Sequence, residues 1–330
     1  MLAAERLPHS LLLVGAEGVG KKHFALEIAK AFVCQSPKSG AACDVCSACR
    51  RADNFTFPKS DKNDDFKKVI FSEHADVGMV IPYNNIILVD AIRELEREAN
   101  FRPFEAKARF FIIDDAEKLS AAKDNAANAL LKTLEEPPPS SYIFLVTSRP
   151  DALLPTIRSR CQTVGFAPVE AKEIEIVLRR TKNASPADAE LLAKLARGSV
   201  GRALGIDLGK FREGRDTMLK VLESLLLKED RVVLLRTAEE MNDAKNKDNY
   251  NQSLEILETL IHDVWNLTLG ADEEKIVNAD IKTNLKKFAE SAESKRLASW
   301  LTEIEKMRES FAVNINRKIA TDALFMQMAG

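Results

Sequence analysis

Short apolar runs alternate with amphipathic stretches along the first half of the chain. Apolar runs of this length, bounded by polar or glycine-rich turns, are typical of strands buried in a parallel sheet. They predict strands at residues 10–14, 69–71, 109–114, 142–147 and 161–165, with helices between them. The pattern therefore indicates an α/β domain over residues 1–166.

The second half of the chain has a different period. Apolar residues recur three and four positions apart, for example at Met218, Val221, Leu222 and Leu225, as they do on one face of an amphipathic helix. This spacing predicts an all-helical domain over residues 209–330, with both tryptophans, Trp265 and Trp300, packed inside it. Residues 167–208 predict a small helical segment in which Ser185 and Pro186 begin a helix.

Composition and charge narrow the class of protein. Only 25 of the 330 residues are glycine or proline, which favours a helix-rich globular chain. The net charge of −2 argues against a strongly basic protein that binds nucleic acid by itself. No apolar run reaches the roughly 18 residues of a membrane span, and the charged N-terminus is unlike a signal peptide. We therefore expect a cytoplasmic protein without a membrane partner.

Four of the five cysteines, Cys34, Cys43, Cys46 and Cys49, have the spacing C-x8-C-x2-C-x2-C. In a reducing compartment such a cluster predicts a metal site, because two C-x2-C steps can present thiolates to one tetrahedral Zn²⁺. A site closed by four thiolates has no open position for a substrate, so the zinc would be structural. The alternative is four ordinary buried cysteines, which the polar surroundings of the cluster disfavour.

A glycine-rich loop follows the first predicted strand. Residues 15–22 read GAEGVGKK, and the order strand, glycine loop, helix is the setting of a phosphate-binding loop. Gly15, Gly18 and Gly20 would let backbone N–H groups surround phosphates, which Lys21 would also contact. Lys22 stands where such loops have a Ser or Thr hydroxyl for Mg²⁺. The alternative is a glycine turn that only joins a strand to a helix.

Two carboxylates end the strand predicted at residues 109–114. In active ATPases with this loop, the first acid supports Mg²⁺ and a neighbouring glutamate orients the attacking water. Here the pair is Asp114 and Asp115, and the second side chain is one methylene shorter than glutamate. Both carboxylates could also simply cap the following helix.

The sequence NALLKTLEEPP at residues 128–138, a strand ending in Thr147 and Ser148, and the triplet Ser159, Arg160, Cys161 together resemble the clamp-loader ATPases. These AAA+ proteins serve bacterial DNA polymerase III, and the resemblance covers almost the whole chain. The segments at residues 89–119 and 314–316 resemble the non-hydrolysing subunit of that family more than its motor subunit, gamma/tau.

The resemblance implies roles for several residues. Arg160 would act as an arginine finger that reaches the γ-phosphate on a neighbouring motor subunit, whereas an intrachain salt bridge is its alternative role. Thr147 or Ser148 would be a polar phosphate sensor, and Arg202 a second sensor, although both positions could be merely structural. The resemblance also implies that residues 167–208 form a lid and residues 209–330 an oligomerising collar.

Three departures from the family pattern, at Lys22, at Asp115 and in the late start of the first strand, predict that this subunit does not hydrolyse ATP. The family implies an upstream segment that helps to hold adenine. The competing hypothesis is an active motor subunit that binds Mg·ATP itself. Either subunit would assemble with gamma/tau and delta subunits, a sliding clamp and primer–template DNA, as part of a DNA-directed DNA polymerase holoenzyme.

Five basic residues have two interpretations. They could face DNA phosphates inside an assembled ring, or they could belong to a solvated face on which glutamates alternate with them, which we favour. These residues are Arg93, Arg97, Arg102, Lys107 and Arg109.

Overall fold

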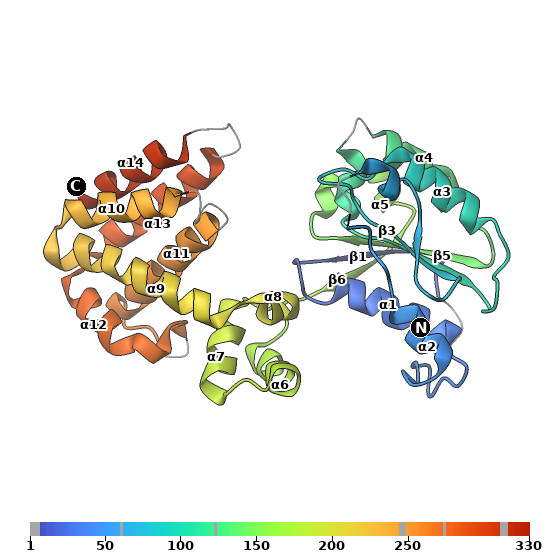
Figure 1. Ribbon diagram of the computed structural model, residues 1–330, viewed down its shortest axis with the longest axis horizontal. Coiled ribbons are helices and arrows are strands. Elements are labelled where there is room, and N and C mark those ends of the chain that lie inside the picture. The colour runs from blue at the N-terminus through green and yellow to red at the C-terminus, as the bar shows by residue number, and fades with distance from the viewer. Residues whose placement is uncertain (1–6, 60–61, 122–123, 244–248, 273–274, 311–315) are drawn as a thin grey trace. The chain divides into compact units, whose positions relative to one another are not determined.

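The computed structural model describes residues 7–59, 62–121, 124–243, 249–272, 275–310 and 316–330 (Figure 1). It divides into two compact units, residues 1–170 with 198–201 and residues 171–197 with 202–330. The predicted separation of lid from collar within the second unit stays a prediction. Of the segment at residues 314–316, which contributed to the resemblance, residues 314 and 315 lie outside the described part of the chain.

The first unit is built on a six-stranded sheet with the order β2-β3-β4-β5-β1-β6. All neighbouring strands are parallel except β2 and β3, which are antiparallel. The strands are β1 (Ser10–Gly15), β2 (Ile70–Phe71), β3 (Val77–Val80), β4 (Arg109–Ile113), β5 (Ser141–Thr147) and β6 (Gln162–Phe166). The predicted strands are thus confirmed to within one residue at each end, and β3 was not predicted.

Strand β3 escaped prediction because it is short and has a glycine in its middle. Gly78 is needed there, since a Cβ at this position would lie 2.6 Å from Cγ1 of Val69. Glycine usually weakens a strand, so sequence patterns assign it to a turn, but here it permits a close approach between neighbours.

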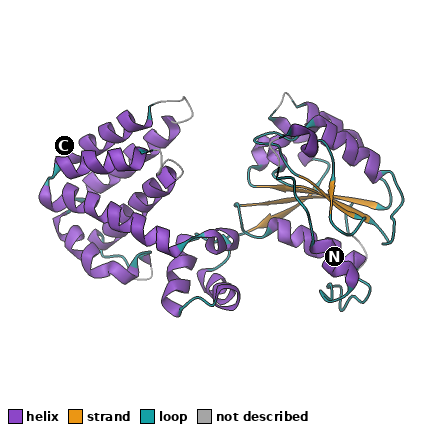
Figure 2. Ribbon diagram, in the orientation of Figure 1, coloured by secondary structure: helices purple, strands orange, loops and turns teal. Residues whose placement is uncertain are grey.

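Helices cover both faces of the sheet, as Figure 2 shows. Because side chains alternate along a strand, Leu11 and Leu13 of β1 pack with α1, whereas Leu12 packs with α3 and α4. The helices of this unit are α1 (Lys21–Val33), α2 (Ser47–Asp53), α3 (Val89–Ala99), α4 (Asn125–Glu135) and α5 (Pro155–Arg158). Short 3₁₀ turns are η2 (Asn63–Phe66), η3 (Ala116–Ser120) and η4 (Pro150–Ala152). The first unit is therefore a three-layer α/β/α domain, as predicted.

The second unit is helical throughout its described residues. It contains α6 (Ala171–Lys182), α7 (Pro186–Leu195), α9 (Leu208–Glu223), a π-helical turn η5 (Ser224–Lys228), α10 (Arg231–Asn242), α11 (Tyr250–Thr268), a 3₁₀ turn η8 (Ala279–Ile281), α12 (Lys282–Ser291), α13 (Ser294–Ser310) and α14 (Arg317–Ala329). A further helix, α8 (Val200–Gly205), begins in residues that pack with the first unit. No helix in the described residues is long and apolar enough to cross a membrane.

One apolar core unites the helices of the second unit. Trp300 is buried in it and Trp265 packs against it partly buried, which confirms the prediction for both tryptophans. The Ser185 side chain accepts a hydrogen bond from the N–H of Asp188 and Pro186 is the first helical residue, so the predicted start of α7 is also confirmed.

Candidate nucleotide, metal and interface sites

Three neighbouring strands of the sheet bring the predicted nucleotide-site residues together. In the order β4-β5-β1, the first strand is followed directly by Asp114, the second ends at Thr147, and the third leads into the glycine loop. Because the three strands are parallel, their carboxyl ends lie at one edge of the sheet, where α/β proteins commonly bind ligands. The sheet topology thus places residues that are 130 positions apart in the chain beside one another.

The loop has the backbone of a phosphate-binding loop. Gly18 and Gly20 have φ angles of 73° and 103°, which glycine adopts without a steric penalty. The buried Lys21 ammonium donates hydrogen bonds to the carbonyl oxygens of Gly15 and Ala16, at 2.7 and 2.6 Å. Burial lowers the pKa of Lys21, and the nearby carboxylate of Glu117 opposes that change. Lys21 thus uses two of the three donors of its ammonium on the loop itself.

The residue after Lys21 forms an ion pair with the first acid. The Lys22 ammonium lies 2.8 Å from Oδ2 of Asp114. Asp115 has a left-handed backbone, with φ 46°, and its carboxylate pairs with Lys118 at 2.8 Å. These residues fit Mg²⁺ poorly, because a protonated lysine has no lone pair for a cation and its ammonium already contacts one oxygen of the carboxylate that would bind one.

A buried carboxylate in the same region was missed by sequence reasoning. Glu117 accepts hydrogen bonds from the hydroxyls of Thr147 and Ser148, at 2.7 and 2.9 Å. Burial alone would raise the pKa of Glu117, but the hydroxyl of Thr147 and the other donors hold it below its usual value. Both predicted sensor hydroxyls are therefore engaged with a carboxylate. The only sequence signal was an acid two residues beyond Asp115, which no common motif identifies.

The structure brings the four clustered cysteines together. Cys34 ends α1, Cys46 caps α2, Cys49 lies within α2, and Cys43 lies in the loop between the two helices. The four Sγ atoms lie within 4.8 Å of one another. Thiolates around a tetrahedral zinc are about 3.8 Å apart, as Zn–S bonds of roughly 2.3 Å require. The all-sulfur donor set and its spacing are thus compatible with one structural zinc ion.

Within the cysteine cluster, the pKa values of two thiols are shifted in opposite directions. Hydrogen bonds from the backbone N–H groups of Cys49 and Gln35 lower the pKa of the Cys46 thiol to about 6. Burial raises the pKa of the Cys49 thiol to about 12. A positive charge at the centre of the cluster would favour the thiolate form of both residues.

A buried lysine fastens this segment to the domain. Lys30 of α1 lies within 2.8 Å of carboxylates on Glu27 and Asp53 and within 2.6 Å of one on Asp44. Its side chain is 5% exposed, so its charge depends on these partners. Asp44 belongs to the loop between Cys43 and Cys46, and the lysine therefore joins α1, the cysteine loop and α2.

Arg160 lies just after α5 with one third of its side chain exposed. Its guanidinium forms an ion pair with Glu135 and donates a hydrogen bond to the Thr156 carbonyl at 2.9 Å. Glu135 belongs to the NALLKTLEEPP segment, so the two most distinctive sequence blocks meet at this pair. Burial raises the pKa of the neighbouring Cys161 thiol to about 12, which makes it a packing residue and not a reactive one.

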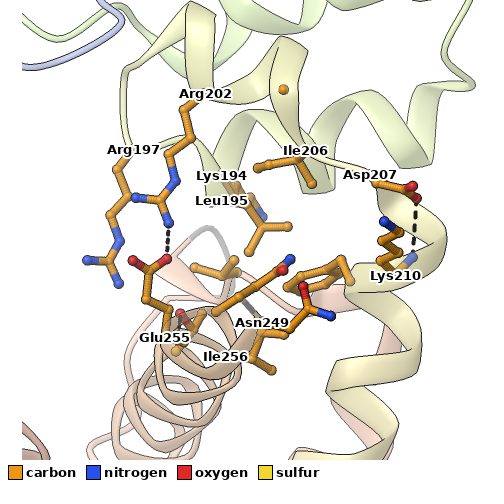
Figure 3. A pocket seen from close by; sticks show the side chains of 15 residues that line it. Lys194, Leu195, Arg197, Arg202, Ile206, Asp207, Lys210, Asn249, Glu255 and Ile256 are labelled. Carbon is orange, nitrogen blue, oxygen red and sulfur yellow. Dashed lines mark hydrogen bonds and ion pairs between the residues drawn. The ribbon is translucent and has the colours of Figure 1, made fainter. Parts of the chain in front are cut away.

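Arg202 lies in the second unit, where it forms an ion pair with Glu255 of α11. Figure 3 shows Arg197 and Arg202 on the same side of a pocket of about 490 Å³, with Glu255 between them and α11. Leu195, Ile206 and Ile256 contribute apolar lining.

Known protein families and individual relatives match both units of this chain. Two family models match, one described as DNA polymerase III, delta subunit, over residues 1–170, and one described as its C terminal part, over residues 213–328. The delta' subunit of DNA polymerase III from Pseudomonas aeruginosa is 30% identical, over 97% of this chain and 92% of its own. That of Bacillus subtilis is 29% identical, over 94% of this chain and 88% of its own.

The chain belongs to the delta' family. The tau subunit of Bacillus subtilis is 31% identical but matches only 68% of this chain and 37% of its own length. The similarity to delta' subunits, in contrast, includes the helical second unit. The resemblance to clamp-loader subunits of DNA polymerase III is therefore confirmed.

The structure corrects one interpretation of the basic residues of this delta' family member. The side chain of Arg109 is only 7% exposed and pairs with Glu98, while its guanidinium lies over the rings of Phe71 and Phe111. It is neither available to DNA nor part of a solvated face. Arg93 and Arg97 are exposed and pair with acids on their own helix, as expected for a solvated face.

Proposed function

We propose that this protein is a clamp-loader subunit that does not hydrolyse ATP and that supplies Arg160 to a neighbouring motor subunit. The observation that carries the proposal is the position of Arg160. A guanidinium that is one third exposed, just after a short helix, can leave Glu135 for a more highly charged partner without unfolding anything. A triphosphate is such a partner, and a delocalised cation can contact several of its oxygens.

Glu135 has a defined part in this proposal. It holds the arginine extended while the subunit is alone, so that little side-chain entropy remains to be lost when the interface forms. The exposed pair itself contributes little to stability, because solvent screens it.

The loop supports a subunit without its own hydrolysis. Lys22 stands in the position of the hydroxyl that holds Mg²⁺ and pairs with Asp114, and Asp115 pairs with Lys118. These features disfavour the competing hypothesis of an active motor. The partners that follow from the family are gamma/tau and delta subunits, with the sliding clamp and primer–template DNA bound by the assembly.

We further propose that three successive parts of the chain have different roles. Residues 1–166 carry Arg160 and a zinc site at Cys34, Cys43, Cys46 and Cys49, residues 167–208 form a lid, and residues 209–330 form the collar that oligomerises. In this scheme the zinc is structural, and Arg202 and Thr147 belong to a site that no longer turns over ATP.

The test uses a reconstituted complex of this protein with its gamma/tau and delta partners. We expect Arg160→Ala to lower DNA-stimulated ATP hydrolysis by tenfold or more at the site it serves, since a trans arginine finger contributes about 10³ to 10⁵ in rate. The matched control is Arg158→Ala, which removes an exposed arginine two residues away that pairs with Asp151. Sizing of both complexes shows whether assembly is intact, and an unchanged rate in an intact Arg160→Ala complex contradicts the proposal.

A further inference from the structure

The phosphate-binding loop at residues 15–22 and the carboxylate of Asp114 already hold a cation that belongs to the chain, the ammonium of Lys22. A divalent ion in a phosphate-binding loop is held by oxygen ligands, namely a hydroxyl in the loop helix, a carboxylate on the next strands and the phosphates. In this protein the first of these positions is Lys22 and the second is Asp114. Both are held by regular structure, since Lys22 is in the first turn of α1 and the N–H of Asp114 donates to the Val80 carbonyl at 3.0 Å.

The Lys22 ammonium lies on the carboxylate that would bind the metal. Its distance of 2.8 Å from Asp114 Oδ2 is that of a charge-assisted hydrogen bond. A magnesium ion binds a carboxylate oxygen at about 2.0 to 2.1 Å, so on either oxygen of Asp114 it would lie close to the ammonium and be repelled by it. The side chain of Asp114 is 17% exposed, so this interaction is partly shielded from water.

The other two carboxylates that follow β4 also have partners. Asp115 pairs with Lys118, and Glu117 accepts from the hydroxyls of Thr147 and Ser148. A divalent ion that approached these acids would therefore meet the ammonium of Lys22 at Asp114 and that of Lys118 at Asp115. The donors for a phosphate are still present, because Lys21 and the backbone of Gly18 and Gly20 keep the geometry of the loop.

We propose that the ammonium of Lys22 takes the place of the divalent cation, so that the loop excludes Mg²⁺ and binds any phosphate ligand without a metal. This inference deepens the proposed function and rests on its assignment of a non-hydrolysing loop. It assigns Lys22 the role of setting metal dependence. The ligand class is a nucleoside triphosphate or inorganic phosphate free of metal.

The experiment measures the binding of Mn²⁺ to the isolated full-length protein, by electron paramagnetic resonance of the free ion, with and without the non-hydrolysable analogue AMP-PNP. Three proteins are compared. These are the wild type, Lys22→Thr, which replaces the ammonium by a hydroxyl, and Lys67→Met, which removes the lysine of a similarly short lysine–aspartate pair, with Asp64, that belongs neither to the loop nor to the acids after β4. The affinity for AMP-PNP is measured in parallel with Mn²⁺ and with a chelator.

We expect Lys22→Thr to bind Mn²⁺ at least tenfold more tightly than the wild type in the presence of AMP-PNP, and Lys67→Met to stay within twofold of the wild type. Lys22 is about half exposed, so its replacement should leave the fold intact. Equal Mn²⁺ affinity of Lys22→Thr and the wild type overturns the inference, whether or not the wild type binds AMP-PNP. It is also overturned if Mn²⁺ tightens wild-type binding of AMP-PNP tenfold. Neither result depends on Arg160, so the proposed function fails or stands separately.

Discussion

At the carboxyl edge of the sheet, the residues predicted for a nucleotide site interact with one another. Gly18 and Gly20 have left-handed angles, while the side chains of Lys22, Asp115 and Glu117 all have partners within the chain. Polar groups that are satisfied internally need no ligand, and a buried group among them stabilises the fold. In our proposal, the residues that the sequence assigns to a nucleotide site are therefore structural ones.

The paired carboxylate of Glu117 allows us to test whether such a residue stabilises the fold. Because its folded pKa is lowered, its charge stabilises the protein above the unfolded pKa of about 4.3, and this contribution is lost as the pH falls through the folded value. We expect Glu117→Gln to cost roughly 1 to 3 kcal/mol at pH 7, and its difference from the wild type to shrink below about pH 4. Urea unfolding at pH 7 and at acid pH measures both. Glu94→Gln on α3, which removes an acid paired with exposed Arg97, should cost less than about 0.5 kcal/mol. Parallel pH profiles for Glu117→Gln and the wild type would show that the charge of Glu117 is unimportant.

At the scale of elements, the cysteine segment is an insertion between α1 and the sheet that depends on a few strong contacts. Its described apolar contribution to the core is small, chiefly Ala48 and Ala52 of α2. In our proposal the segment is therefore held by its metal site and by the ion pairs of Lys30. Since Lys30 contacts a carboxylate within the cysteine loop, loss of the lysine should be felt at the metal.

We accordingly expect Lys30→Met to release zinc several-fold faster than the wild type to a colorimetric chelator. The reason is that the loop loses its only described ion pair to α1, through Asp44. The control is Lys38→Met, which removes an exposed lysine within the same segment. The wild type should release one zinc ion per chain. Release at the wild-type rate from Lys30→Met would mean that the cysteines alone hold the segment.

At the scale of the whole molecule, the net charge is −2, and three of the basic residues considered for DNA, Arg93, Arg97 and Arg109, already pair with acids. Affinity for DNA depends on phosphate neutralisation, so a nearly neutral protein gains little from it. In our proposal the DNA contact therefore belongs to the assembly.

We expect the isolated protein to bind primed DNA with a Kd weaker than about 100 µM at 150 mM salt, and with a shallow dependence on salt concentration. Fluorescence anisotropy with labelled primer–template measures this, and the complex with gamma/tau and delta subunits serves as the positive control. Micromolar binding by the isolated protein would instead indicate a basic surface that acts alone.

The sequence by itself determined the α/β first domain, the helical second half, and the identity of the metal and arginine candidates. These features depend on local periodicity and on residue types at short spacing, which a chain displays without folding. It did not determine which charges would pair. Lys22 with Asp114, Arg160 with Glu135 and Glu117 with Thr147 join residues far apart in the chain, and only the parallel order of β4, β5 and β1 and the helices around them decides such contacts. Strand β3 was not predicted for the same reason. Its Gly78 is needed because the side chain of Val69 leaves no room for a Cβ there, and only the folded chain brings these two residues together.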